Sequence, residues 1–296
     1  MLKQPHYQSQ SNQAIAKSAI HFDYETLAQI YNKTRTDYIV PMPMNAKGLI
    51  QYVAHYDIDL EASIVVMDSE NKPLGLGMLG RRDHRAWITR LGLVPQGRGK
   101  GLGNLMMDTL FQNARERGDT ESQLEVIKDN DPAHHLFIKY GFTPTRELLI
   151  IRRPINPNFT YQPDEDVQFT KLDTDTIERY LHQQRADTPS WIEETPSIIN
   201  AGNLEGYQMN DDSGVSAWII FQNNPFKISH IVMGHSHDKK FLSGRIMKSL
   251  LSYIHQLYPM KDTIVENVPP NDPSWVSYQD LSYIETFRRI EMVCTL

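Results

Sequence analysis

The sequence repeats itself, and this repeat limits the possible fold more than any other feature of the chain. The triplet Asn130-Asp131-Pro132 recurs as Asn271-Asp272-Pro273, at an offset of 141 residues (271 − 130). The same gap-free offset also aligns Glu125 with Glu266, Gly103 with Gly244, Met106 with Met247 and Leu110 with Leu251. A repeat held in one register, with helix and strand patterns in step, predicts two copies of one supersecondary unit.

Each copy is expected to fold as an α/β unit with a mixed sheet. In the first copy, apolar runs and turn residues predict strands over 16–22, 64–66, 74–82, 85–94, 124–127 and 147–152. Apolar residues at helical spacing predict helices that begin after Asp23 and cover 46–55, 101–117 and 132–140. In the second copy the pattern restarts with a strand over 167–170, a helix from Asp173, a helix over 191–201 and further strands.

A segment rich in proline, asparagine and aspartate separates the two copies. Such residues favour turns and loops, so residues 155–166 are interpreted as a linker. We therefore expect an N-terminal arm at 1–14, a first copy at 15–154 and a second copy at 167–296. The length of 296 residues fits two domains of about 150 residues each.

Composition and charge exclude several classes of protein. The formal net charge of −6 argues against general attraction to nucleic acid or to anionic membrane. Cys294 is the single cysteine, which excludes an intramolecular disulfide and a cysteine-based zinc site, and no metal is expected. The start of the chain lacks a secretory signal pattern, and no apolar run reaches the roughly 20 residues that span a bilayer. A cytoplasmic protein with no membrane partner is expected.

The segment Leu91-Gly-Leu-Val-Pro-Gln-Gly-Arg-Gly-Lys-Gly-Leu-Gly103 carries the clearest chemical signal. It reads as a strand, a glycine-rich loop and the start of a helix. Glycines allow close approach of an anion, and the first N–H groups of a helix lack partners within the helix. Together they form a phosphate cradle, which Arg98 and Lys100 supplement with charge. The spacing fits neither a Walker loop nor a dinucleotide fingerprint, and a glycine-rich turn without a ligand remains the alternative.

Two motifs in order resemble the GCN5-related N-acetyltransferases, the GNAT superfamily. The loop Pro95-x-x-Arg-Gly-Lys-Gly-x-Gly103 resembles motif A of this family. Leu124-Glu-Val126, followed by Asn130-x-x-Ala-x-x-Leu-Phe-x-Lys-x-Gly-Phe142, resembles its second signature. The resemblance covers residues 15–153, and the repeat extends it faintly to the second copy. It implies two GNAT-like acyl-CoA N-acyltransferase domains in tandem.

The resemblance implies acetyl-CoA as co-substrate and assigns the residues that bind it. In such folds the strand before the loop splays from its neighbour, and pantetheine lies in the gap. The implied cofactor-binding residues are Leu91, Leu93, Val94, Arg98, Gly99, Lys100, Gly101, Leu102, Gly103 and Asn130.

Two residues are candidates for proton transfer. Glu125 lies where some relatives hold a general base. The alternative is that Glu125 is a strand residue without a catalytic role, because acetyltransferases of this type can use a water relay in place of a dedicated base. Many relatives carry a tyrosine acid where this chain has Phe137, which has no proton to give. Tyr140 is a candidate substitute acid, or it packs against the core.

The second copy departs from the motif at the positions that define the cradle. At the offset of 141, Leu242 replaces Gly101, Lys239 replaces Arg98 and Lys240 replaces Gly99. A leucine side chain where phosphate should lie predicts that this copy binds no cofactor. Tyr278 and Glu266 occupy the positions of Phe137 and Glu125. The second copy is expected to shape the acceptor pocket or to stabilise the first copy.

The sequence therefore predicts an acetyl-CoA-dependent N-acetyltransferase that acts on a primary amine by direct attack in a ternary complex. The acceptor would be a small-molecule amine or a peptide or protein amine. A non-catalytic acyl-CoA-binding or sensor protein is the alternative from a different class. The sequence does not indicate the acceptor or the oligomeric state.

Overall fold

The computed structural model describes residues 14–183, 188–212, 214–236, 242–272 and 274–296. The first copy contains β1 (Ile15–Ser18), η1 (Ala19–His21), α1 (Tyr24–Thr34), α2 (Ala46–His55), β2 (Ile64–Met67), β3 (Pro73–Arg82), β4 (Arg85–Leu93), η2 (Pro95–Gly97), α3 (Leu102–Glu116), β5 (Glu121–Ile127), α4 (Asp131–Lys139) and β6 (Thr143–Arg153). The second contains β7 (Val167–Lys171), α5 (Thr174–Leu181), η3 (Trp191–Glu193), α6 (Thr195–Ala201), β8 (Leu204–Asp211), β9 (Ser216–Asn223), β10 (Lys227–His235), α7 (Gly244–Leu257), β11 (Asp262–Val268), α8 (Ser274–Asp280) and β12 (Ile284–Thr295).

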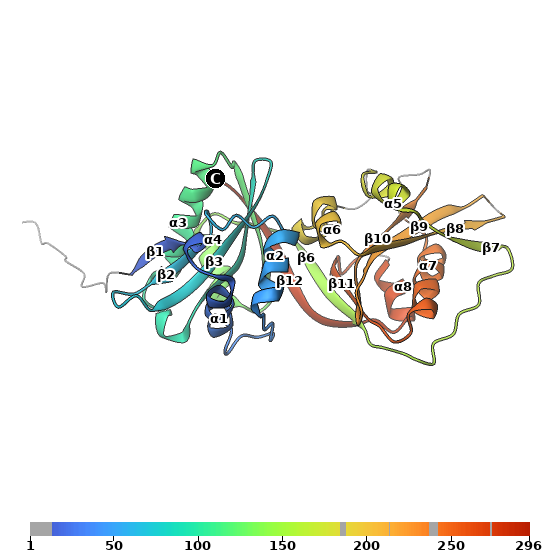
Figure 1. Cartoon of the computed structure of the whole chain (residues 1–296), viewed down its shortest axis with the longest axis horizontal. Coiled ribbons are helices and arrows are strands. Elements are labelled where there is room, and N and C mark those ends of the chain that lie inside the picture. Colours follow the sequence, from blue (N-terminus) through green and yellow to red (C-terminus); the bar gives the residue numbers. More distant parts are fainter. Residues whose placement is uncertain (1–13, 184–187, 213, 237–241, 273) are drawn as a thin grey trace, which may run out of the picture.

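The repeat is visible in the structure as paired elements at the predicted offset. Strand β11 begins and ends 141 residues after β5, and α7 and β12 follow α3 and β6 at nearly the same offset. The two copies lie side by side along the long axis of the molecule (Figure 1). The α/β fold class with a mixed sheet is thus confirmed, and the expected N-terminal arm falls almost entirely outside the described residues.

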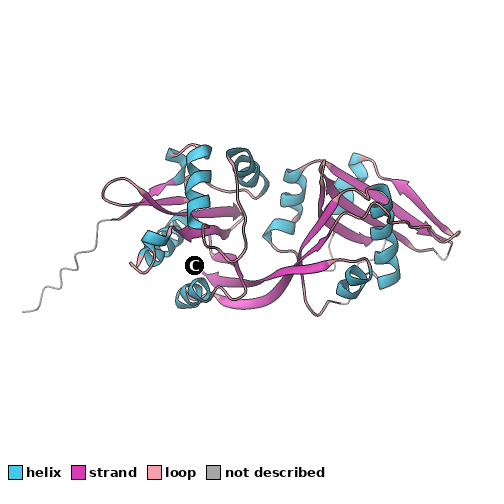
Figure 2. Ribbon diagram, turned by 90° about the horizontal axis from the view of Figure 1, so that it is seen from below, coloured by secondary structure: helices cyan, strands magenta, loops and turns pink. Residues whose placement is uncertain are grey.

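The two copies share one sheet because they exchange their last strands. The order is β1-β2-β3-β4-β5-β12-β6-β11-β10-β9-β8-β7. Strand β12 pairs with β5, β6 pairs with β11, and the two exchanged strands pair with each other in antiparallel fashion. In Figures 1 and 2, β6 and β12 run as long curved strands from one half to the other.

The exchange moves apolar side chains from each copy into the core of the other. Met292 and Cys294 of β12 pack in the cluster beneath α3, with Leu110 and Phe142 of the first copy. Leu149 and Ile151 of β6 pack beneath α7 in the second copy's cluster. Each copy therefore has part of its hydrophobic core supplied by a strand of the other copy, and burial of these side chains holds the two copies together.

Local chemistry explains where the sequence-based element boundaries were and were not correct. Asp23 caps α1 by accepting from the N–H of Thr26 at 2.7 Å, as expected. The first strand ends at Ser18, before the expected position, because the Ser18 side chain caps a 3₁₀ turn. The expected helix over 191–201 is split into η3 and α6, with Pro196 in the first turn of α6.

A buried ionic cluster fixes the two copies to each other. Arg82 of β3 forms ion pairs with Asp57 at 2.7 Å and with Glu194 of the second copy at 2.9 Å. Its guanidinium also donates to the carbonyl of Trp191 and lies 4.4 Å from the centre of that ring. Removing one partner of such a cluster leaves uncompensated charge in the interior.

Arg82→Ala should therefore lower the free energy of unfolding by about 3–5 kcal/mol. The matched control is Lys72→Ala, because Lys72 pairs with Glu70 on the surface, where both side chains are mostly exposed. That control should cost less than about 1 kcal/mol. Guanidinium chloride denaturation measures both values, and equal losses in the two variants would contradict the interface role of Arg82.

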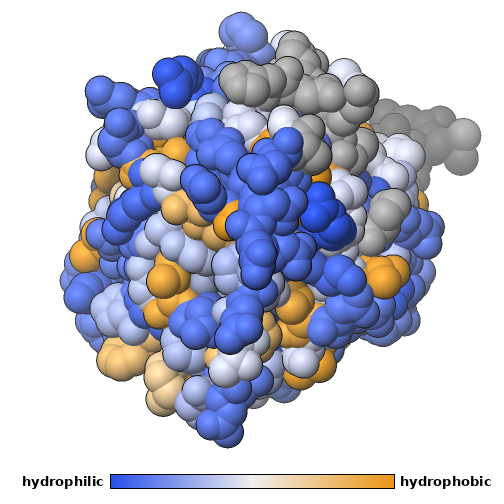
Figure 3. Space-filling model, turned by 90° about the vertical axis from the view of Figure 1, so that its right-hand side faces the viewer, coloured by the Kyte–Doolittle hydropathy of each residue, from blue (hydrophilic) through white to orange (hydrophobic). Residues whose placement is uncertain are grey.

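The outer face of the second copy carries apolar side chains in small separate areas among polar ones (Figure 3). Within the described ranges, no helix has the length and apolar character needed to cross a membrane.

Candidate functional site

Strands β4 and β5 separate after a short parallel contact, and the gap between them forms the centre of the candidate site. They pair only at Arg85, Ala86 and Trp87 of β4. Beyond this point, a register shift between β3 and β4 places Arg90 in a bulge with φ 52°. A similar short contact of two residue pairs joins β10 and β11 in the second copy.

Backbone groups of β4 face the gap at alternate residues. The N–H of Val94 donates to Leu74 of β3, so Leu91 and Leu93 direct their backbone groups to the other side of the strand. Their carbonyls accept from the guanidinium groups of Arg35 at 3.1 Å and Arg98 at 3.2 Å. Strand β5 pairs with neither residue, because its contact with β4 ends at Trp87.

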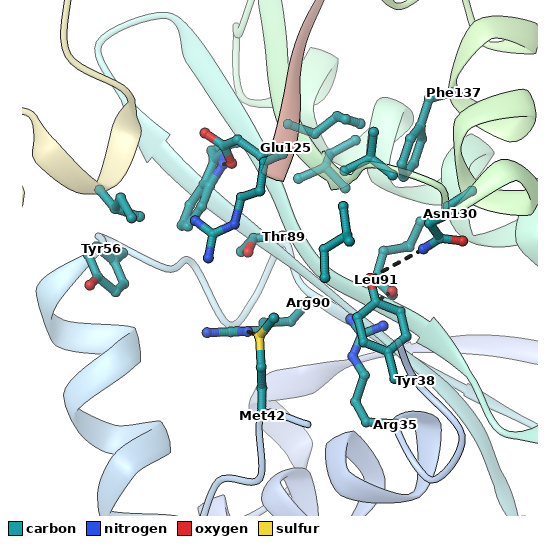
Figure 4. Close-up of a pocket in the computed structure, with 18 of the residues that line it drawn as sticks. Arg35, Tyr38, Met42, Tyr56, Thr89, Arg90, Leu91, Glu125, Asn130 and Phe137 are labelled. Atoms are coloured by element: carbon teal, nitrogen blue, oxygen red, sulfur yellow. Dashed lines mark hydrogen bonds between the residues drawn. The ribbon is translucent and has the colours of Figure 1, made fainter. Parts of the chain in front are cut away.

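A cavity of about 170 Å³ opens from this gap (Figure 4). Its walls come from the α1–α2 loop, the end of α2, strands β4 and β5, and helix α4. Of the residues predicted from the sequence, it brings together Leu91, Glu125 and Asn130, with Phe137 on the same wall. The second copy also contributes to it, through Ile192, Glu266 and Arg289.

Glu125 lies on β5 with its carboxylate in this cavity. One carboxylate oxygen, Oε2, accepts from the indole N–H of Trp87 at 2.7 Å, whereas Oε1 is buried without a partner among the described residues. Burial raises the pKa of Glu125 to about 7, although the charge of Arg289 and the Trp87 bond act in the opposite direction. Such a carboxylate is poised to take a proton near neutral pH.

Glu266, the counterpart of Glu125 in the second copy, reaches the same cavity. It forms an ion pair with Arg289 at 2.8 Å. Burial acts to raise the pKa of Glu266, but the charges of Arg289, His230 and Lys227 and the hydrogen bond from Arg289 together outweigh it and keep the pKa below the usual range. A second cavity of about 320 Å³ lies between α2 and the second copy's sheet, and Tyr52, Tyr56 and Glu266 line both cavities.

The glycine-rich loop has the geometry of an anion cradle. Gly99 and Gly101 have φ values of 71° and 77°, and a Cβ atom added at either would meet only open space. No described acceptor takes the N–H groups of residues 99–103, and Gly101 gives α3 no side-chain cap. Lys100 is exposed and forms no ion pair with a described residue. These groups fit the pyrophosphate of acetyl-CoA.

The side chain of Arg98 is paired with Asp37 in the α1–α2 loop. Its guanidinium binds both carboxylate oxygens of Asp37, at 2.6 and 2.7 Å, and also donates to the carbonyl of Leu93. The expected direct contact of the Arg98 side chain with pyrophosphate stays a prediction. Arg98 ties the α1–α2 loop to β4 beside the cradle.

Tyr140 does not reach the cavity, which corrects its expected place beside the leaving thiolate. Its hydroxyl donates to the carbonyl of Asn104 at 3.0 Å and to Asp108 at 2.8 Å. Burial and the bond to Asp108 raise the pKa of Tyr140 to about 12. A helix places residues three apart on neighbouring faces, and here the face of Tyr140 packs on α3.

Tyr38 supplies a hydroxyl that the sequence did not reveal. It lies in the α1–α2 loop and accepts a hydrogen bond from the Asn130 amide at 3.2 Å (Figure 4). Among the described atoms, its own proton has no acceptor. No motif marks a loop tyrosine 92 residues before Asn130, so only the fold could place the two together.

The second copy lacks the corresponding cradle. Leu242 packs against the second copy's core at the Gly101 position. Ser243 caps α7 by accepting from the N–H of Ile246, so a side chain occupies the helix start that is open in α3. Tyr278 is buried in the same core. Lys239 and Lys240 lie outside the described residues.

Part of the chain is similar in sequence to known acetyltransferases. Residues 25–142 match the model of the acetyltransferase (GNAT) family. A segment of 60 residues is 40% identical to the uncharacterized N-acetyltransferase YdgE of Bacillus subtilis (strain 168), covering 20% of this chain and 38% of that relative. The chain thus spans well under half the length of this relative.

The fold of the whole chain is similar to that of solved GNAT structures. A GCN5-related N-acetyltransferase from Sphaerobacter thermophilus superposes with a TM-score of 0.71, at 14% identity, over 95% of each chain. A tandem GNAT protein from the clavulanic acid biosynthesis pathway superposes with a TM-score of 0.64, at 13% identity, over 96% of this chain and 98% of the other. At these identities the likeness supports the tandem fold alone.

Proposed function

This chain belongs to the GNAT superfamily, with the acetyltransferase family domain at residues 25–142, and from this premise we propose that it is an acetyl-CoA-dependent N-acetyltransferase. One observation carries the proposal: Glu125 and the splayed part of β4 line the same cavity, beside the open glycine cradle. The pKa of Glu125 is about 7. The acceptor is a primary amine of a small molecule, peptide or protein.

The cofactor end of the site is assigned to the loop and to β4. Gly99 to Gly103 bind pyrophosphate through unpartnered N–H groups, and Lys100 adds positive charge. Acetyl-CoA, when bound, supplies an activated acetyl thioester. The backbone of Leu91 and Leu93, which lies beyond the part of β4 that pairs with β5, is placed to orient the pantetheine arm and to polarise the acetyl carbonyl.

Glu125 is assigned as the general base. Its unpartnered Oε1 accepts a proton from the ammonium of the acceptor, directly or through water, and leaves a neutral amine. The amine nitrogen then forms a bond to the acetyl carbon while the carbon–sulfur bond breaks, and the nitrogen loses its second proton to water. The products are an amide and CoA, whose thiolate takes up one proton.

Tyr38 is assigned as the source of that proton. Its hydroxyl lies beside Asn130, on the same side of the cavity as Phe137 (Figure 4). The resemblance places the pantetheine arm at Asn130 and the leaving sulfur near the Phe137 position, so Tyr38 takes over the function of the missing tyrosine.

Tyr38→Phe should reduce kcat by about 10²-fold at neutral pH, because a positioned acid contributes at least this factor. Tyr140→Phe is the matched control and should change kcat by less than about twofold, because its hydroxyl is bonded to α3. Steady-state kinetics measures both. Equal and small losses in the two variants would mean that water protonates the thiolate.

The proposed function is tested by turnover. The purified chain is incubated with acetyl-CoA and a panel of amines, free thiol is followed spectroscopically, and products are identified by mass spectrometry. Each thiol released should be matched by one amine that gains an acetyl group. Tight binding of acetyl-CoA without acetylated product from any class of amine would instead favour a sensor.

A further inference from the structure

We infer that the acceptor carries a carboxylate, and that Arg90 binds it while Glu125 receives the proton of the amine. This inference rests on the proposed function, because it concerns the acceptor end of the same cavity. It identifies the substrate class as a small zwitterionic amine, such as a free amino acid.

Arg90 is a cationic side chain in the cavity wall with no anionic partner. Its Nη1 donates to the hydroxyl of Tyr31 at 3.1 Å and lies 3.7 Å from the sulfur of Met42. Its Nε is buried without a partner, and no described carboxylate lies within ion-pair distance. Leaving the buried Nε of this guanidinium without a hydrogen-bond acceptor costs free energy, which a bound carboxylate would recover.

The other two arginines that line the cavity, Arg35 and Arg289, already have partners. Arg35 lies over the ring of Tyr38 and donates to the carbonyl of Leu91, and Arg289 pairs with Glu266. The cavity wall thus holds three guanidinium groups against two carboxylates, and Glu125 is only partly ionised near pH 7. This excess of positive charge favours an acceptor with an anionic group over a polyamine.

The backbone holds the Arg90 side chain toward the acceptor end. Arg90 has φ 52°, a left-handed conformation that costs a non-glycine residue free energy and is typical of functional positions. In Figure 4 its side chain extends from β4 toward Tyr56, away from Leu91 and Asn130 at the cofactor end. Its guanidinium lies 4.3 Å from the centre of the Tyr52 ring, which fixes its plane.

Arg90 and Glu125 therefore place a group that binds a carboxylate and a group that accepts an amine proton in the same cavity. A planar guanidinium binds a carboxylate through two parallel hydrogen bonds. The cavity of about 170 Å³ and its neighbour of about 320 Å³ have room for a small molecule that carries both groups.

The test compares matched acceptors at saturating acetyl-CoA. Glycine, L-leucine, L-phenylalanine and L-glutamate are each paired with the corresponding α-carboxamide, and kcat/KM is measured by thiol release. The acid should exceed its amide by at least about tenfold for the best pair, because a charge-assisted hydrogen bond is lost in the amide. Amides that react as well as or better than all four acids would overturn the inference.

Variants separate recognition from folding. Arg90→Gln should abolish the preference for the acid, mainly through KM, while the Kd of acetyl-CoA is unchanged. Arg90→Lys should retain part of the preference because it keeps the charge but loses the bidentate geometry. The matched control is Arg179→Gln, since Arg179 is exposed on α5 and lies over the ring of Tyr180, far from either cavity.

Failure of this inference and failure of the proposed function give different results. Acetylation of amines without a preference for the acid, or with a preference that survives in Arg90→Gln, removes the carboxylate site and leaves the acetyltransferase. Absence of turnover with these acids and amides, while another class of amine is acetylated, also removes only the carboxylate site. Absence of turnover with every class of amine, despite bound acetyl-CoA, overturns the acetyltransferase and the carboxylate site together.

Discussion

Glu125→Gln is expected to lower kcat/KM by about 10²–10⁴-fold, the range that a positioned general base contributes. The wild-type profile should rise with pH through the pKa of about 7 that burial gives Glu125, because the base must be ionised to accept a proton. The variant should lack this rising limb. Steady-state kinetics from pH 5.5 to 9, with the acceptor concentration varied at each pH, measures both effects.

The same substitution has an opposite effect on stability. Folding raises the pKa of Glu125 from 4.5 to about 7, so the folded chain binds this proton more tightly than the unfolded chain. The contribution of Glu125 to the free energy of unfolding therefore falls as the pH rises from about 4.5 to 7. Glu125→Gln removes that loss, and its melting temperature should exceed that of the wild type at pH 8 but not near pH 4.

Glu121→Gln is the matched control, because Glu121 lies on the same strand and is exposed. It should leave turnover and melting temperature unchanged. Near-full turnover of Glu125→Gln across the pH range would withdraw the base role and leave only the cofactor site.

Gly101→Leu should abolish acetyl-CoA binding, because it introduces into the first copy the residue that the second copy has at Leu242. The leucine side chain would project into the open space of the cradle, and the residue would have to keep φ at 77° or distort the loop. We expect a Kd at least about 10³-fold weaker by calorimetry, with the fold retained because the loop is on the surface.

Gly118→Leu controls for the strain of a leucine at positive φ. Gly118 follows the other end of α3, has φ 81° and, like Gly101, faces open space. Both variants should lose similar stability, whereas only Gly101→Leu should lose acetyl-CoA. Unchanged affinity in folded Gly101→Leu would remove the loop from the cofactor site.

The sequence predicted the features that depend on local patterns. The repeat, the helix over α3 and the short glycine-rich loop follow from spacing and from backbone preferences of neighbouring residues. The place of Glu125 beside the splayed strand also follows, because the motif fixes its distance from the loop in the chain. These features need no knowledge of which strands pair over long distances.

The features that the sequence missed depend on contacts between distant segments. The exchange of β6 and β12 gives no local signal, since each strand has the same apolar pattern whichever partner it takes. Asp37 captures Arg98 across 61 residues, and Tyr38 meets Asn130 across 92. Only the tertiary fold determines these pairs.

The strand exchange explains why a second copy without a cradle still matters to the site. Arg289 lies on exchanged strand β12, two residues from Glu291, the direct cross-strand partner of Glu125. Glu266 and Ile192 of the second copy complete the cavity wall. Removal of the second copy would open the acceptor end of the site and expose the core beneath α3.

Titration of the intact chain with acetyl-CoA tests most directly the claim that one cofactor site, in the first copy, serves the whole molecule. Isothermal titration calorimetry should give one molecule bound per wild-type chain and none per Gly101→Leu chain. Two equivalent sites per chain, or a site that survives in Gly101→Leu, would contradict the account.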